Sequence, residues 1–231
     1  MIGMLGGMGP ESTAYTYMRM IRCCQQEYGA KLDSDFPPIL VYSVPVPDVV
    51  NKGSNDAEVF EELRKGVKKL SDAGAGFSFI ACNTMQGFIP ELRKTAPMLS
   101  IVEETVKAAG ETGISSWGIL ATETTIGKGF YQKAFSETGL SVIKPDAESQ
   151  AKVTSAIRDI LAGGRNSPAK EKLLQAVEIL RKNGAEGIIL ACTDLPIVIS
   201  GKDTGMKTID TADVIARAAV ERYMKKGDMN E

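Results

Sequence analysis

The sequence predicts an α/β fold made of two pseudo-symmetric domains, each with a central, mainly parallel sheet flanked by helices. Short apolar runs alternate along the chain with segments of helical period, which is typical of parallel α/β proteins. The chain also resembles itself at a shift of 110 residues, which indicates a duplicated structural unit. Its 231 residues are enough for two small domains, in agreement with both patterns.

The expected strands are the short apolar runs, and the expected helices carry apolar residues three or four positions apart. Pro10 suits a first helical turn, and the glycines of Ala73-Gly74 and Asn183-Gly184 suit helix C-termini. Asp210 or Thr211 is expected to cap the last helix. In chain order the predicted strands cover residues 2–5, 39–44, 77–81, 117–120, 140–143 and 187–191, and the predicted helices cover 11–28, 56–72, 147–161, 168–182 and 210–225.

The repeat divides the chain. A shift of 110 superposes Gly74-Ala75 on Gly184-Ala185 and Ala81-Cys82 on Ala191-Cys192, and the preceding helices match as well. A shift of 115 places the first strand over the strand at 117–120. The break falls near residues 97–102, and the last helix is expected to pack back on the first half. The predicted domains are therefore 1–98 plus 208–231, and 99–207.

Composition excludes several classes of function. The net charge of −2, without long runs of like charge, gives no footprint for nucleic acid or an anionic membrane. No apolar run is long enough to cross a bilayer and no signal peptide is evident, so a cytoplasmic protein with a small-molecule ligand is expected. The absence of histidine removes the commonest metal ligand and general base, and four cysteines without C-x-x-C spacing indicate free thiols and no metal site.

Cys82 and Cys192 are the candidate catalytic residues. Each follows a buried strand at an equivalent position of the repeat, so both are expected at strand C-terminal ends, facing one another across a cleft. Helix N-terminal N–H groups there are expected to lower the thiol pKa toward neutrality. A pair of acid/base groups on opposite faces of one carbon suits racemisation. The alternative is that each cysteine is a small buried hydrophobe, which is the interpretation preferred for the mid-helix Cys23 and Cys24.

Polar residues beside these cysteines form a candidate substrate site. Asn83, Thr84 and Thr193 can donate hydrogen bonds to a carboxylate whose charge grows as the α-proton leaves, which matters in an enzyme without pyridoxal phosphate. Asp48 and Asp194 are candidate orienting groups, and either can instead cap a turn or helix.

The glycine-rich loop that includes Met8 and Gly9 follows the first strand and opens the first helix, so its amides can hold an anionic group. It lacks the last glycine of a dinucleotide fingerprint. The alternative interpretation is a turn that needs glycine only for its backbone angles.

The sequence resembles the aspartate/glutamate racemase family from end to end. The segments that carry the resemblance are Leu5-Gly6-Gly7-Met8-Gly9-Pro10, Ala81-Cys82-Asn83-Thr84-Met85 and Ala191-Cys192-Thr193-Asp194-Leu195-Pro196. The resemblance implies two pseudo-symmetric domains with the active site between them, Cys82 and Cys192 as the acid/base pair, no cofactor, no metal, and a homodimer. The sequence departs from the family at three positions: Gln86 stands where many members have histidine, Val49 where many have arginine, and Leu161 where some have lysine.

The predicted activity is racemisation of a small amino acid, with aspartate or glutamate as the expected substrate. The departures remove the usual cations for a second carboxylate, and Lys52 and Arg165 are the nearby replacements, although both also suit exposed loops. The alternatives are a racemase for a non-acidic amino acid or a hydantoin, a cysteine-based decarboxylase, and a non-catalytic protein that binds a small acid.

Overall fold

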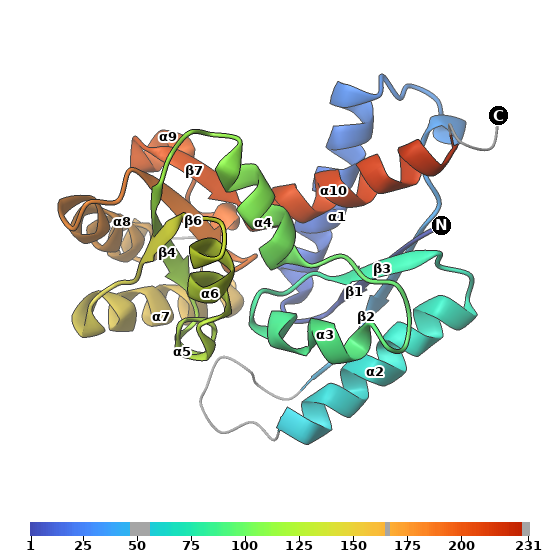
Figure 1. The fold of residues 1–231 in the computed structure, drawn as a ribbon, viewed down its shortest axis with the longest axis horizontal. Coiled ribbons are helices and arrows are strands. Elements are labelled where there is room, and N and C mark those ends of the chain that lie inside the picture. The colour runs from blue at the N-terminus through green and yellow to red at the C-terminus, as the bar shows by residue number, and fades with distance from the viewer. Residues whose placement is uncertain (47–55, 165–166, 228–231) are drawn as a thin grey trace.

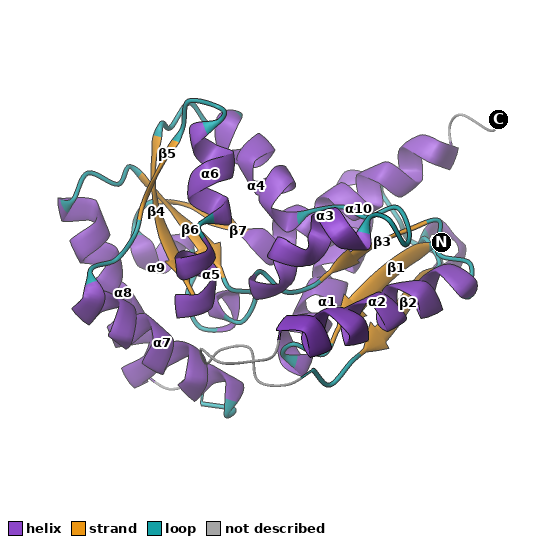
Figure 2. Cartoon of the chain, turned by 60° about the horizontal axis from the view of Figure 1, so that its bottom comes forward, coloured by secondary structure: helices purple, strands orange, loops and turns teal. Residues whose placement is uncertain are grey.

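The computed structural model describes residues 1–46, 56–164 and 167–227, and it folds into two lobes, each built on its own parallel sheet (Figure 1). The first lobe has the strand order β2-β1-β3, and the second has the order β5-β4-β6-β7. Helices flank both sheets, as Figure 2 shows. The predicted α/β class and the parallel character of the sheets are confirmed.

The first sheet is built around β1 (Ile2–Gly6), which is buried along its whole length. It pairs in parallel with β2 (Ile39–Ser43) and β3 (Phe77–Ile80). Because side chains alternate along a strand, Ile2 and Met4 face α1 (Pro10–Glu27), while Leu5 faces α2 (Asp56–Asp72). A short helix, α3 (Ile89–Leu92), follows the turn that carries Cys82.

The second sheet repeats this plan with β4 (Ser116–Ala121), β5 (Ser141–Ile143), β6 (Gly187–Ala191) and β7 (Lys207–Asp210). One face packs on α7 (Ala147–Leu161) and α8 (Ser167–Lys182). The other face packs on α4 (Ile101–Gly110) and α6 (Phe130–Ser136). Two short helices, α5 (Glu123–Lys128) and α9 (Gly201–Thr204), complete this lobe.

All six predicted strands and all five predicted helices are present within a few residues of their expected bounds. Strand β7 was not predicted, because its sequence Lys-Thr-Ile-Asp offers a single buried apolar residue, Ile209, at the edge of the sheet. Helix α4 was not predicted because it begins at the expected break between the halves. Helices α3, α5, α6 and α9 were also not predicted, and the longest of these four, α6, has seven residues.

The last helix, α10 (Thr211–Gly227), leads from β7 in the second lobe to pack against α1 in the first lobe, and it also contacts α4 (Figure 1). Its N-terminus is capped by Asp210, whose Oδ1 accepts hydrogen bonds from the N–H groups of Ala212 and Asp213. Of the two caps predicted, the structure therefore uses the aspartate. The domain bounds 1–98 plus 208–231 and 99–207 stay a prediction.

Candidate active site

A cavity of about 210 Å³ lies between the two lobes and contains both candidate catalytic cysteines. It is smaller than the roughly 300–1,000 Å³ of sites for drug-sized ligands, and so suits a small molecule. Loops after β1, β3, β4 and β6 contribute to its wall, which is the expected position for a site in parallel α/β proteins. The described residues that line it are Gly7, Met8, Gly9, Pro10, Val46, Cys82, Asn83, Thr84, Thr122, Ile157, Leu161, Cys192, Thr193 and Asp194.

Cys82 lies two residues beyond the end of β3, with its side chain 6% exposed. The backbone N–H groups of Thr84 and Met85 and the Thr84 hydroxyl point at its sulfur, and each favours the thiolate. Burial nevertheless outweighs them and raises the pKa of the thiol to about 11. The predicted lowering of this pKa is therefore wrong for the protein alone, because the sequence shows the donors but not the depth of burial.

Cys192 directly follows β6 and is also buried. Burial raises the pKa of its thiol well above the ordinary value, and the charge of Asp194 adds to the effect. The sulfur lies 3.5 Å from Oδ2 of Asp194, close enough for the thiol to donate a weak hydrogen bond. The Asp194 backbone N–H opposes the shift, but as at Cys82 it does not overcome burial.

Asp194 is 4% exposed and lies against the first helix of the other lobe. Its carboxylate interacts with the hydroxyl of Ser12 and with Cys192, and burial raises its pKa despite both contacts. It occupies the N-cap position of a short 3₁₀ helix, Leu195–Ile197, without making a side-chain capping bond there. Of the two roles considered from the sequence, the position beside the thiol is the one observed.

The polar residues that follow each cysteine are buried and largely engaged with other protein groups. Asn83 donates from Nδ2 to Thr211 Oγ1 at 2.9 Å and accepts from the Tyr131 hydroxyl at 2.5 Å. The Thr84 hydroxyl lies 3.0 Å from that of Thr122. Thr193 donates to the Ala81 carbonyl at 3.4 Å. All three predicted residues line the cavity, and the second N–H of the Asn83 amide has no hydrogen-bond partner among the described residues.

The glycine loop needs glycine for its backbone, and anion binding by its amides stays a prediction. Gly7 has φ +96°, and a Cβ there would lie 2.5 Å from the backbone N and O of Val44, so its backbone requires glycine. Its N–H is taken by the Thr13 hydroxyl at 2.9 Å. Met8 and Gly9 nevertheless line the cavity, and a Cβ on Gly9 would meet Asp194 Oδ1 at 2.8 Å.

Two departures from the family pattern fall within the described part of the chain. Leu161, at the end of α7, lines the cavity and is 43% exposed. Gln86 is buried and holds the Cys82 turn: its Nε2 donates to the Cys82 carbonyl at 3.0 Å, and its Oε1 accepts from the Ile101 N–H at 2.8 Å. Asp48, Val49, Lys52 and Arg165 lie outside the described residues.

Sequence reasoning missed several lining residues, among them Thr122 and Ile157. Thr122 follows β4 as Cys82 and Cys192 follow their strands, so the same sheet-edge argument identifies it. Ile157 carries no such signal, because its position on α7 is that of an ordinary core residue. Cys23 and Cys24 are buried in the core between α1 and α10, as their packing interpretation predicted.

Within the described ranges, no group of three His, Cys, Asp or Glu side chains lies close enough to hold a metal ion. The same ranges contain no helix with the length and apolar character to cross a membrane.

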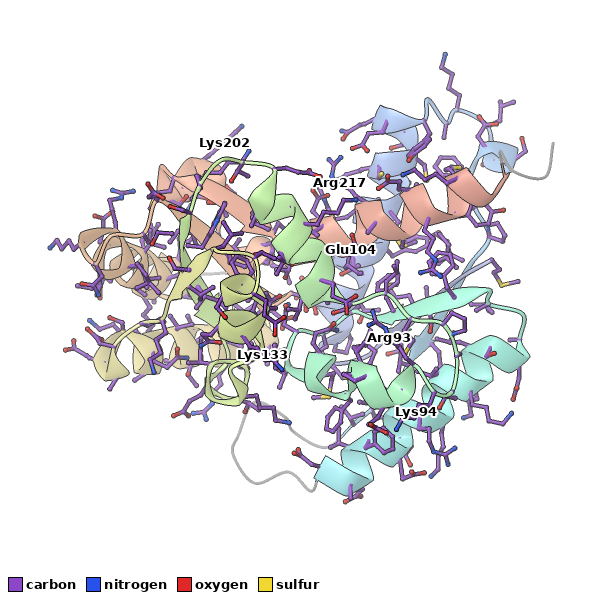
Figure 3. All side chains as sticks on the ribbon, viewed as in Figure 1. Arg93, Lys94, Glu104, Lys133, Lys202 and Arg217 are labelled. Carbon is purple, nitrogen blue, oxygen red and sulfur yellow. The ribbon has the colours of Figure 1, made fainter. Side chains whose placement is uncertain are left out.

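Of the charged side chains labelled in Figure 3, Lys94, Lys133 and Lys202 lie at the outer surface of the molecule. Asp194 is the charged residue in the described lining of the cavity.

The sequence profile of the Asp/Glu/hydantoin racemase family matches residues 5–219. The chain belongs to this family. The racemase assignment is therefore confirmed at the level of the family, and the chain is an isomerase. A curated relative, the broad specificity amino-acid racemase RacX of Bacillus subtilis, is 32% identical over 228 residues, which cover 97% of this chain and 98% of that protein.

Solved structures agree with the assignment. An aspartate racemase homologue from Pyrococcus horikoshii is 28% identical, with a TM-score of 0.79 over 95% of this chain and 97% of the other. The aspartate racemase of Picrophilus torridus superposes with a TM-score of 0.84 over 96% of this chain and 93% of that chain. At 23% identity the latter shows the shared fold alone.

Proposed function

We propose that this racemase inverts a small amino acid by exchanging protons between its α-carbon and the thiols of Cys82 and Cys192. The observation that carries the proposal is that two cysteines, from equivalent positions of the two halves, line one small cavity. A single buried cysteine would be explained by packing alone, but two related ones beside the same space suit a reaction with two faces.

In the proposed reaction one cysteine acts as a thiolate base and the other as a thiol acid. The thiolate removes the α-proton from one face, and the electron pair moves into the carboxylate to form an enediolate. The second thiol then delivers a proton to the opposite face, which leaves the inverted amino acid and a thiolate on the other side. The reverse reaction uses the same groups in exchanged roles.

The raised thiol pKa values require a source of positive charge at the moment of binding. The α-ammonium group of the substrate supplies it, because a cation beside a buried thiol favours the thiolate. Asp194 is suited to accept a hydrogen bond from that ammonium, since its carboxylate borders the cavity. The free Asn83 N–H and nearby backbone N–H groups are suited to the growing charge on the enediolate.

Aspartate or glutamate is the substrate expected from the resemblance, and a non-acidic amino acid is the alternative. One observation favours the alternative: Met8, Val46, Ile157 and Leu161 give the cavity an apolar wall, and Asp194 places a carboxylate beside it. A second carboxylate on the substrate would be repelled by Asp194 and desolvated by the wall. An uncharged side chain meets neither cost.

The experiment that tests the proposal is solvent deuterium incorporation at Cα, measured with inversion over L- and D-alanine, serine, asparagine, aspartate and glutamate. A racemase incorporates deuterium and inverts at least one pair, whereas a protein that only binds small acids incorporates none. Faster turnover of the acidic pair than of the neutral ones would reject the neutral substrate. Inversion of a 5-substituted hydantoin without inversion of any free amino acid would reject amino-acid racemisation.

The homodimer and the cytoplasmic location remain predictions. Sedimentation tests the oligomeric state, and cell fractionation tests the location.

A further inference from the structure

The two turns that carry the cysteines are linked to one another by the residues that follow each cysteine. Asn83 donates to Thr211 Oγ1 at 2.9 Å, and Thr211 Oγ1 donates in turn to the carbonyl of Leu190 at 2.8 Å. In the opposite direction Thr193 donates to the carbonyl of Ala81 at 3.4 Å. Each link therefore starts one residue after one cysteine and ends one or two residues before the other.

The stronger of these links is held in one orientation by a tyrosine. The Tyr131 hydroxyl, on α6, donates to Asn83 Oδ1 at 2.5 Å, which leaves Nδ2 facing Thr211. Tyr131 and Thr211 are fully buried, and Asn83 is 2% exposed. The Tyr131 hydroxyl and the Thr211 hydroxyl are therefore shielded from solvent, and buried hydrogen bonds of this kind fix a local geometry.

Thr211 lies where the two lobes join. It is the first residue of α10, directly after β7 of the second sheet, and α10 packs on α1 of the first lobe. The neighbouring residue, Asp210, accepts a hydrogen bond from Tyr15 of α1 at 2.7 Å. The Asn83–Thr211–Leu190 link thus joins the Cys82 turn to the strand before Cys192 at a point where both lobes are anchored.

We propose that Thr211 and Tyr131 are positioning residues that keep the Cys82 and Cys192 thiols at a fixed separation by tying Asn83 to the end of β6. Proton transfer at two faces of one carbon needs each sulfur to lie about 3–3.5 Å from the α-carbon at the same time. A misplacement of about 1 Å can lower the rate about 100-fold. The two thiols lie on different lobes, so a movement of one lobe relative to the other changes the distances from both sulfurs to the α-carbon. This inference rests on the proposed two-cysteine function.

The test compares Thr211→Val, Thr211→Ser and Tyr131→Phe with a matched control, Thr16→Val. Thr16 is also fully buried, but its hydroxyl donates to the Ser12 carbonyl of its own helix. For each variant, kcat and KM for inversion are measured in deuterated water, together with the ratio of deuterium gained by recovered substrate to deuterium gained by inverted product. Thermal unfolding reports stability separately.

Thr211→Val and Tyr131→Phe are expected to lower kcat about 10- to 100-fold with little change in KM. The ratio of deuterium in recovered substrate to deuterium in inverted product is expected to rise. When the second thiol is misplaced, the first thiol more often returns a solvent-derived proton to the face that it deprotonated. Thr211→Ser keeps the hydroxyl and is expected to restore both readouts. Thr16→Val is expected to lose stability without changing the ratio.

Wild-type kcat and ratio in both Thr211→Val and Tyr131→Phe would overturn the inference. So would a loss of activity with an unchanged ratio that Thr211→Ser does not restore, since that result indicates a structural role. Cys82→Ser and Cys192→Ser keep the two proposals distinct. If either retains full racemisation, the two-cysteine function itself is wrong; if both are inactive while the positioning variants behave as wild type, only the positioning role is wrong.

Discussion

At the scale of single residues, the site combines strong donors with deep burial. The N–H groups of Thr84 and Met85 reach the Cys82 sulfur, yet the pKa of its thiol is about 11. The same balance holds at Cys192, where Asp194 adds a like charge to the thiolate. Burial therefore favours the protonated form of both thiols, and in the proposed reaction a cationic group of the substrate would favour the thiolate.

Serine variants test the separate roles of the two thiols. Cys82→Ser and Cys192→Ser are each expected to abolish inversion while leaving the fold intact, because a hydroxyl is far too weak an acid to supply the base. The remaining thiol still exchanges the α-proton on its own face. Each variant should therefore exchange deuterium into one enantiomer only, and the two variants should prefer opposite enantiomers, as proton NMR of L- and D-substrates would show. Exchange into the same enantiomer by both variants would contradict the two-face arrangement.

The pH dependence of turnover follows from the raised thiol pKa values. A raised pKa keeps the base protonated at neutral pH, so kcat/KM in the wild type should increase as pH rises through neutrality. Burial is the largest cause of the raised pKa of Cys192, and the negative charge of Asp194 is the second. Asp194→Asn removes that charge, so the pKa of Cys192 should fall and the increase in kcat/KM should occur at lower pH. The shift should be larger in the reaction direction that uses Cys192 as the base, since for Cys82 the charge of Asp194 is a lesser cause.

The control is Asp72→Asn, which removes the same charge from an exposed position at the end of α2. It should leave both pH profiles in place. If Asp194→Asn shifts the pH profile of kcat/KM equally for the two directions of racemisation, or shifts neither profile, Asp194 does not act through Cys192.

At the scale of elements, the end of α7 offers a test of substrate class. Leu161→Lys places a cation in the cavity wall, where a hydrogen bond to a carboxylate is worth about 1.5–3 kcal/mol. The ratio of kcat/KM for aspartate to that for alanine should therefore increase about tenfold or more. Leu161→Met, which keeps size and apolar character, should leave the ratio unchanged. A ratio that does not respond to the lysine would mean that the substrate side chain lies elsewhere in the site.

The elements also show how far the sequence alone leads. Positions of Cys82 and Cys192 were predictable, because a parallel sheet brings strand C-termini to one edge and the repeat marks equivalent strands. The partners of Asn83 were not, since Tyr131 and Thr211 are 48 and 128 residues away and neither stands in a motif. Strand β7 was missed because an edge strand needs little apolar sequence. The predicted return of the last helix to the first half is nevertheless confirmed by its packing on α1.

At the scale of the whole molecule, α10 extends from the second lobe into the core of the first. Its buried face, which includes Ala216 and Ala219, packs in the core of the first lobe with Met20 and Ile2. Ion pairs reinforce the contact with α1, including Arg19 with Asp213 at 2.5 Å and Arg217 with Glu27. Glu104 of α4 and Arg217 of α10 are near one another on the outside of this junction (Figure 3).

This arrangement predicts that the lobes unfold together in the wild type and separately once α10 is displaced. Trp117, the only tryptophan, is fully buried in the second lobe and reports on that lobe by fluorescence, while far-ultraviolet circular dichroism reports on both. In urea the two signals should coincide for the wild type. Ala219→Asp buries a charge between α10 and α1, and should cost about 3 kcal/mol or more in the first lobe.

In the Ala219→Asp variant the circular dichroism transition should therefore begin at lower urea than the Trp117 transition, because the cores of the second sheet take only the partly buried Val214 from α10. Ala73→Asp, at an exposed position after α2, makes the same chemical change in the first lobe and should leave the signals coincident. If the two signals also coincide in Ala219→Asp, at a lower midpoint, the lobes form one cooperative unit that α10 does not divide. A ligand bound between the lobes should bring the separated transitions back together, since it stabilises only the state in which both lobes are folded.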